Sequence, residues 1–102
     1  MVINISKSDG TIVMFLKGRM DAVSSPDFDR AVEELMAKGE RYFLINLSDL
    51  EYISSAGLQS LLATAKRLEQ TEGEISLSHL KGAVREVFEI SGFDTLFPIL
   101  DS

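Results

Sequence analysis

The amino-acid sequence predicts an α/β fold: one domain, residues 1–102, in which helices pack on a mixed β-sheet. A chain of 102 residues, 45% hydrophobic and 25% charged, suits one compact domain with its own core. Segments with apolar residues at strand spacing alternate along the chain with segments at helical spacing. The expected order is β-β-α-β-α-β-α-β, an opening hairpin followed by βα units, whose crossovers are almost always right-handed.

The first two strands are expected to form an antiparallel hairpin. Val2–Lys7 has the pattern of a strand, and Thr11–Lys17 is a second, more apolar run. Between them, Ser8-Asp9-Gly10 is typical of a hairpin turn. Gly18 interrupts the second run, and Arg19–Ala22 is predicted to be a strand end or a loop.

A helix is expected to follow this loop. Ser25 is the predicted N-cap, Pro26 suits the first helical position, and Asp27 and Asp29 suit the positive first turn. Gly39 is typical of the C-terminal stop of a helix. The apolar residues at helical spacing are Phe28, Ala31, Val32, Leu35 and Met36.

The middle of the chain predicts a buried strand followed by a second helix. The apolar run Tyr42–Leu47 is typical of a strand covered on both faces, and we expect it near the centre of the sheet. The helical pattern runs from about Ser55 to Thr71, and Gly73 ends it. The apolar face of this helix consists of Leu58, Leu61, Leu62, Ala65 and Leu68.

The last third of the chain predicts a strand, a helix and a final edge strand. Glu74–Ser78 has strand alternation, Lys81–Ser91 has helical spacing, and Gly92 ends that helix. Leu96–Leu100 is the predicted last strand, and Pro98 indicates a position at the edge of the sheet. The apolar stripe of the third helix consists of Ala83, Val84, Val87, Phe88 and Ile90.

Composition and charge exclude several classes of function. The net charge of −6 would repel nucleic-acid phosphates, so direct binding of DNA or RNA is not expected. The chain has no Cys, which excludes disulfides, thiolate catalysis and Cys-ligated zinc. It contains no apolar run near the ~20 residues that span a bilayer, and its N-terminus does not resemble a signal peptide. A cytoplasmic protein without membrane insertion is therefore expected.

Two serines, Ser54 and Ser55, are predicted at the strand-to-helix turn. There the first amides of a helix lack intrahelical partners and the helix dipole is positive. A hydroxyl in that place can cap the helix, act as a nucleophile or accept a phosphate. A serine hydrolase would need a base, and the chain has one histidine, His79; the Gly-x-Ser-x-Gly elbow is absent because Ile53 takes the place of its first Gly.

Metal and cofactor sites are not indicated by the sequence. Asp21, Asp49 and Glu51 could gather near one loop, but they have no spacing typical of calcium or zinc ligands. The turn also lacks the glycines of a phosphate-cradling loop, since Gly57 is its only glycine. We therefore expect no metal, no cofactor and no catalytic residues.

Phosphorylation of a cap serine is chemically compatible with the fold. A phosphoserine adds about −1.5 to −2 charges, and a helix N-terminus tolerates this charge. The alternative from the residues alone is that Ser54 or Ser55 only caps the helix, which is worth ~1 kcal/mol. The physical arguments leave both roles open.

Three segments resemble the STAS domain, and specifically the bacterial anti-sigma factor antagonists. Asn46–Leu58 resembles the family signature, Gly18–Asp21 resembles its Gly-x-x-Asp motif after the second strand, and Val84–Phe93 resembles its third helix and the turn that follows. The resemblance covers almost the whole chain. It implies a STAS-like fold and a regulatory binding module rather than an enzyme.

The resemblance also implies partners and a switch. A free antagonist binds an anti-sigma factor that is also a serine kinase, and a sigma factor is thereby released. The kinase uses ATP to phosphorylate one serine at the start of the second helix, and a phosphatase resets the protein. The motif assigns the phosphate to Ser55. Many members have Asp where this chain has Ser54, so this chain has a second hydroxyl beside the first, and Ser54 is the second choice.

The expected docking surface combines this turn with the loop after the second strand and the exposed side of the second helix. Two alternative roles remain: a STAS subunit of a lipid-transport or stress-sensing complex, and a small hydrolase using Ser55 and His79. The predicted partner-binding residues are Asp21, Asp49, Ser54, Ser55, Ala56, Gly57, Gln59 and Ser60.

Overall fold

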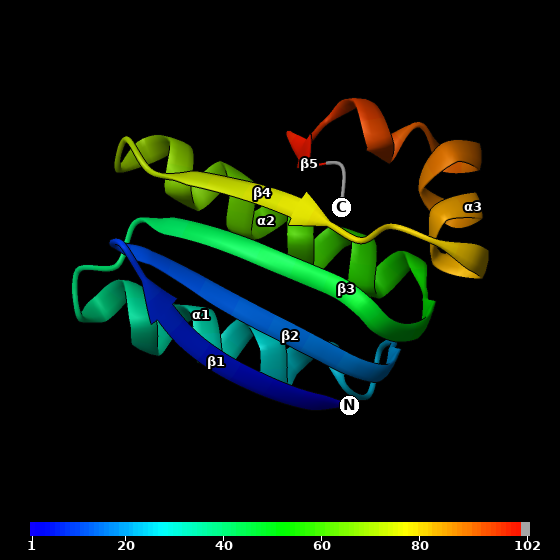
Figure 1. The fold of residues 1–102 in the computed structure, drawn as a ribbon, viewed down its shortest axis with the longest axis horizontal. Helices are drawn as coiled ribbons and strands as arrows, with labels where there is room; N and C mark the ends of the chain where they lie inside the picture. The colour runs from blue at the N-terminus through cyan, green and yellow to red at the C-terminus, as the bar shows by residue number, and fades with distance from the viewer. Residues whose placement is uncertain (101–102) are drawn as a thin grey trace.

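A five-stranded mixed β-sheet with three α-helices makes up the structure, a computed structural model that describes residues 1–100 (Figure 1). None of its helices has the length and apolarity needed to cross a bilayer. The elements are β1 (Val2–Ser8), β2 (Thr11–Met20), α1 (Ser25–Ala37), β3 (Tyr42–Ile53), α2 (Ser55–Gln70), β4 (Glu74–Ser78), α3 (Gly82–Ser91), the 3₁₀ helix η1 (Phe93–Thr95) and β5 (Ile99–Leu100).

The spatial order of the strands is β1-β2-β3-β4-β5, the same as their order in the chain. β1 and β2 are antiparallel, whereas β2, β3, β4 and β5 run parallel to one another. Asp9 and Gly10 both have positive φ, 51° and 82°, as the mirror-image turn of a two-residue hairpin requires. The predicted mixed sheet, its opening hairpin and the central position of β3 are confirmed.

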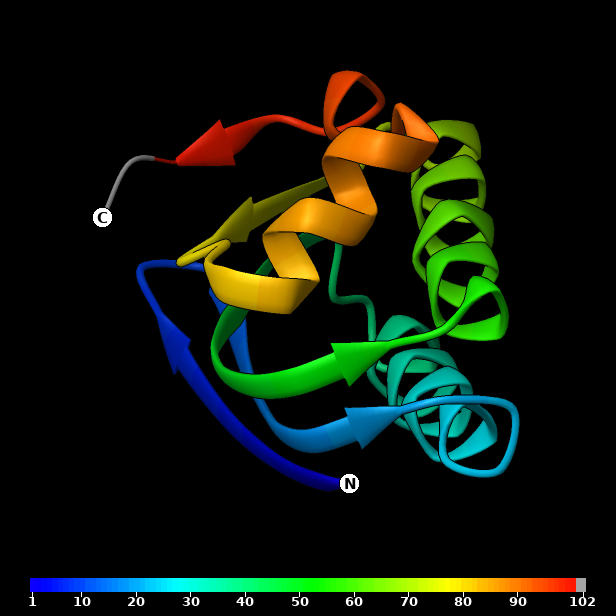
Figure 2. The same ribbon diagram turned by 90° about the vertical axis from the view of Figure 1, so that its right-hand side faces the viewer.

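Two helices cover one face of the sheet, and the third packs at one end (Figures 1 and 2). α1 and α2 lie side by side behind the sheet in Figure 1, while α3 contacts β3 and the segment around η1. Phe88 of α3 is fully buried and meets Phe97 edge-to-face, with ring centroids 6.3 Å apart. One buried cluster thus joins all three helices to the sheet. Its largest fully buried members are Phe28, Phe43, Phe88, Met14, Leu16, Met20, Ile45, Leu47, Ile53, Leu61, Leu68 and Leu77.

β3 is longer than the sequence predicts, because it continues six residues beyond Leu47. Its buried residues alternate up to Leu47 and then occur every third residue, at Leu50 and Ile53. The register with β2 explains this change. Over the paired span β3 uses two more residues than β2, one between Asn46 and Asp49 and one between Leu50 and Tyr52. Extra residues of this kind bend a strand and increase its twist, and β3 curls strongly in Figure 2.

Several predicted boundaries are corrected by smaller amounts. β2 runs through Gly18 to Met20, and Gly18, with a φ of 99°, lies at one of the two irregularities in the pairing with β3. Ser24, not Ser25, precedes the first turn of α1, and α3 begins at Gly82. β5 contains only the last two residues of the predicted strand, because the chain bends at Leu96 and Phe97 after η1; it does lie at the edge, as Pro98 predicted.

The third helix has a narrower apolar face than the sequence predicts. Val84 and Phe88 are buried, and Val87 is half-buried. Ala83 is exposed and Ile90 is 87% exposed, so neither belongs to the stripe that contacts the core. The helix has only ten residues and packs at the end of the sheet, where one narrow row of side chains faces β3.

Replacement of Leu50 by Ala tests the shifted alternation of β3. The Leu50 side chain is 5% exposed, so we expect Leu50→Ala to lower the free energy of unfolding by about 2–5 kcal/mol. The matched variant Glu51→Ala, at an exposed neighbouring position, should change it by less than ~0.5 kcal/mol. Urea unfolding followed by circular dichroism measures both values. Equal losses would contradict the assigned strand phase.

Candidate functional site

The C-terminal ends of β2 and β3 lie side by side and form the base of the candidate site. Met20 and Ile53 are paired at the end of the ladder, and the Ser54 N–H donates a 2.9 Å hydrogen bond to the Met20 carbonyl. Because the bond joins two backbone groups, it fixes the start of α2 against β2 whatever the side chains are.

Ser54, one of the two serines considered for the cap, is the N-cap of α2. Its backbone is extended, with φ −95° and ψ 175°, and its Oγ accepts a 3.4 Å hydrogen bond from the Gly57 N–H. Ser55 is the first helical residue, and its side chain is exposed. Among residues 1–100 the Ser55 hydroxyl has no hydrogen-bond partner. The two hydroxyls are therefore separated into one that caps the helix and one that faces solvent.

Gly57 brings the first turn of α2 unusually close to the strand ends. A Cβ on this residue would lie 2.7 Å from Ile53 Cγ1 and 2.9 Å from the Met20 carbonyl oxygen. Side chains do not approach backbone oxygens this closely in folded proteins. Gly57 is buried, so its role at this site is to let the helix approach rather than to contact a partner.

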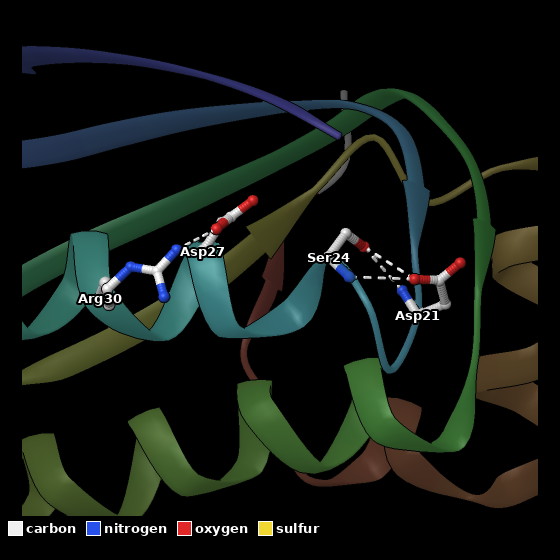
Figure 3. A network of polar contacts seen from close by, with 4 residues as sticks. All are labelled: Asp21, Ser24, Asp27 and Arg30. Atoms are coloured by element: carbon white, nitrogen blue, oxygen red, sulfur yellow. Dashed lines mark hydrogen bonds and ion pairs between the residues drawn. The ribbon is translucent and has the colours of Figure 1, made fainter.

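Asp21 and Ser24 hold the loop that follows β2 (Figure 3). Asp21 Oδ1 accepts hydrogen bonds from the N–H groups of Val23 (3.0 Å) and Ser24 (3.1 Å). Ser24 Oγ accepts a 2.9 Å bond from the Asp21 N–H and donates a 2.7 Å bond to the Arg19 carbonyl. Figure 3 shows this loop beside the turn from β3 into α2, and shows the Asp27–Arg30 ion pair further along α1.

The same hydrogen bonds lower the pKa of the Asp21 carboxyl below its ordinary value. The Ser24 N–H is the main cause, followed in the same direction by the Val23 N–H, the Ser24 hydroxyl and the positive charge of Arg19; desolvation opposes them. Asp21 follows Met20, which accepts the Ser54 N–H, and the Asp21 carboxylate holds the loop after β2 through its hydrogen bonds.

The other predicted partner-binding residues are divided between the cap and more distant positions. Ala56 is half-buried in the first turn of α2, and Gln59 is exposed on that helix. Asp49 is exposed and pairs with Lys17. It precedes Ile53 by four residues, so it lies along β3 and not at the cap.

Ser60 is only 8% exposed and donates a 3.2 Å hydrogen bond to Asp29 on α1. The expectation that Ser60 lies on an exposed face is wrong, because α1 covers that side of α2.

His79 follows β4 and lies next to the middle of β3 in the ladder. Ser78 is paired with Asn46, and β3 continues from there for seven residues before α2 begins. His79 lies 3.0 Å from its neighbour, measured from Nδ1 to Ser78 Oγ. Across residues 1–100, no group of three or more metal-binding side chains comes together.

Three exposed residues beside the cap were not predicted from the sequence. Val23, at the tip of the loop, is 88% exposed. The Arg19 guanidinium lies over the Tyr52 ring, with Cζ 4.2 Å from the ring centroid. A single Val in a loop gives no periodic signal, and the pairing of Arg19 with Tyr52 depends on the extra residues in β3.

The fold and the cap define a small α/β domain that presents one solvent-facing serine at a helix N-terminus, next to a loop held by its own hydrogen bonds. The family model of the STAS domain matches residues 2–102, and the chain belongs to that family.

Two curated relatives bear regulatory names. The chain is 41% identical to BtrV of Bordetella bronchiseptica, provisionally named as an anti-sigma factor antagonist, over 100% of this chain and 88% of BtrV. It is 30% identical to the anti-sigma-B factor antagonist of Listeria monocytogenes, over 86% of this chain and 77% of that protein.

A solved structure with the same fold is that of the Bacillus cell fate determinant SpoIIAA. Its phosphorylated form has a TM-score of 0.78 and 20% identity, covering 99% of this chain and 91% of that one. Its unphosphorylated form also gives a TM-score of 0.78, with 18% identity, over 99% of this chain and 89% of that one. At this identity the likeness concerns the fold.

Gly57→Ala tests the close approach of α2. The added methyl group must displace the helix or the end of β2, so we expect a loss of ~1–3 kcal/mol in unfolding free energy and faster hydrogen exchange of the Ser54 N–H. Ser55→Ala, at the exposed position two residues earlier, is the control and should change both values little. If the Ser54 N–H in Gly57→Ala exchanged at the wild-type rate, the contact between Gly57 and the strand ends would not be tight.

The pH dependence of stability tests the role of Asp21. Because the folded-state pKa lies below that of the unfolded chain, the carboxylate stabilises the fold above about pH 4, and this stabilisation is lost as the pH falls through the lowered pKa. Asp21→Ala should lower the urea midpoint at pH 7 and converge with wild type as the pH approaches 2. The Asn side chain keeps an acceptor oxygen but does not titrate, so the urea midpoint of Asp21→Asn at pH 7 should lie above that of Asp21→Ala. A difference in urea midpoint between Asp21→Ala and the wild type that stays the same at every pH would contradict this role.

Proposed function

We propose that the protein is an anti-sigma factor antagonist whose binding to an anti-sigma factor is switched off by phosphorylation of Ser55. The observation that carries the proposal is the exposed Ser55 hydroxyl at the first position of α2, next to a cap that is already complete without it. The names of the BtrV and Listeria relatives supply the class of partner.

A phosphate at Ser55 suits this position physically. The first amides of a helix have no intrahelical acceptors, and the helix dipole favours negative charge there. The contacts that fix α2, from Ser54 N–H to Met20 and from Gly57 to the strand ends, do not involve the Ser55 side chain. Phosphorylation would therefore leave the fold intact and change only the surface. The two solved forms of SpoIIAA support this for the fold in general.

Ser55 is a better acceptor than Ser54 in this structure. The Ser54 hydroxyl is half-buried and accepts the Gly57 N–H, so its modification would remove a helix cap. Ser55 has no such role. In the proposed cycle an anti-sigma factor with serine kinase activity transfers the γ-phosphoryl group of ATP to Ser55, the modified protein dissociates, and a phosphatase hydrolyses the phosphoserine.

The proposed docking surface comprises the cap, the Val23 loop and the exposed side of α2. Beside Gln59, a groove between α1 and α2 is lined by Asp29 and Glu33, and Arg67 lies 3.6 Å from the Glu33 carboxylate. Together with the net charge of −6, these carboxylates favour a partner with a basic contact surface. This basic surface would face the groove, whereas a carboxylate of the partner would face the cap. A phosphoserine dianion buried against that carboxylate would cost enough to dissociate a micromolar complex.

Substitution of Ser55 tests the switch. Ser55→Asp should keep the wild-type melting temperature but bind the anti-sigma factor from the same genome at least about 100-fold more weakly, as measured by calorimetry. Ser55→Ala should bind like wild type and resist release when the kinase and ATP are present. Ser6→Asp adds the same charge on β1 and is the control. Wild-type affinity of Ser55→Asp would refute the switch, and mass spectrometry after incubation with ATP would identify the modified serine.

A further inference from the structure

Arg19 forms no ion pair within residues 1–100. It is paired with Tyr52 at the end of the β2–β3 ladder, and its guanidinium carbon lies 4.2 Å from the centroid of the Tyr52 ring. The ion pairs within residues 1–100 involve other cations, and the Arg19 side chain forms no hydrogen bond there. Both Arg19 and Tyr52 are exposed, so the guanidinium donors are open to an incoming anion.

The backbone holds Arg19 beside the cap serines. The next residue, Met20, accepts the Ser54 N–H at 2.9 Å, and Tyr52 precedes Ser54 by two residues on β3. The Arg19 carbonyl accepts the hydrogen bond of Ser24 Oγ, which fixes the backbone from which its side chain extends. After the Ser24 and Val23 hydrogen bonds, the charge of Arg19 also contributes to the lowered pKa of Asp21, so its field reaches the loop next to the cap.

We propose, on the basis of phosphorylation at Ser55, that Arg19 is the residue that pairs with the phosphate and that the pairing withdraws its guanidinium from the Tyr52 ring. A planar guanidinium matches two phosphate oxygens with two parallel N–H donors, whereas its contact with an exposed ring is weak. A phosphate dianion on Ser55 that came within reach of the guanidinium would therefore displace the ring contact.

The pairing would change the surface at two points with one modification. The phosphate adds negative charge at the cap, and the movement of Arg19 exposes the face of Tyr52 and neutralises a positive charge on the surface next to the cap. A partner that contacts Arg19 or Tyr52 would then lose that contact in addition to meeting the phosphate. Arg19 is in this sense a positioning residue of the switch, and it does not take part in the transfer of the phosphoryl group.

The second ionisation of the phosphoserine tests this pairing without any partner. Phosphoserine incorporated at position 55 during translation can be titrated by ³¹P NMR. We expect its second pKa to lie about half a unit or more below the ordinary value of ~6, because a nearby cation favours the dianion. Arg19→Ala should raise this pKa and leave only the part of the shift that the helix N-terminus causes, and Arg19→Lys should give an intermediate value. Arg41→Ala removes an exposed cation at the opposite end of β3 and should have no effect.

The Tyr52 ring gives a second measurement. Its proton resonances should shift on phosphorylation of Ser55 in the wild type, and should not shift in the Arg19→Ala background. A phosphoserine pKa that is the same in wild type and Arg19→Ala, or a Tyr52 shift that persists without Arg19, would overturn the inference. These results do not depend on the switch itself. Loss of partner binding by Ser55→Asp together with an unshifted phosphoserine pKa would refute only the role of Arg19. Wild-type partner binding by Ser55→Asp together with a pKa shift that depends on Arg19 would refute only the proposed function.

Discussion

The close approach of α2 to the end of β2 is the contact on which the candidate site depends. Two backbone features produce it, the hydrogen bond from the Ser54 N–H to the Met20 carbonyl and the absence of a side chain on Gly57. Backbone contacts of this kind are insensitive to charge on neighbouring side chains. The start of the helix is therefore fixed independently of the Ser55 side chain.

The polar groups around the cap fall into two sets with different tasks. Asp21, Ser24 and Ser54 satisfy backbone donors and acceptors of the loop and helix, which makes them part of the framework. Ser55, Arg19 and Val23 contact little of the framework and face solvent. From the sequence alone, an acidic residue near such a site suggests a direct contact with a partner. In the structure the Asp21 carboxylate instead accepts hydrogen bonds from its own loop.

The order of elements, the hairpin and a serine cap at Ser54 or Ser55 could be predicted because each depends on local signals. Asp9-Gly10 specifies its own turn, and a serine before an apolar helical pattern specifies a cap. The second half of β3 could not be predicted, because the spacing of Leu47, Leu50 and Ile53 resembles neither a regular strand nor a helix until the extra residues are known. Ser60 was misplaced for a related reason: which side of α2 faces solvent depends on where α1 packs.

The two surplus residues of β3 also determine where the following helix begins. Each adds about 3.3 Å of chain over a span that β2 covers with fewer residues, and the excess length is taken up as curvature. A deletion at either irregularity would leave the inward-facing order of Leu47, Leu50 and Ile53 intact but shorten this arc. Ser55 would then be drawn back along the sheet. Its location is thus encoded in how many residues separate it from the hydrophobic core, and not only in which residues they are.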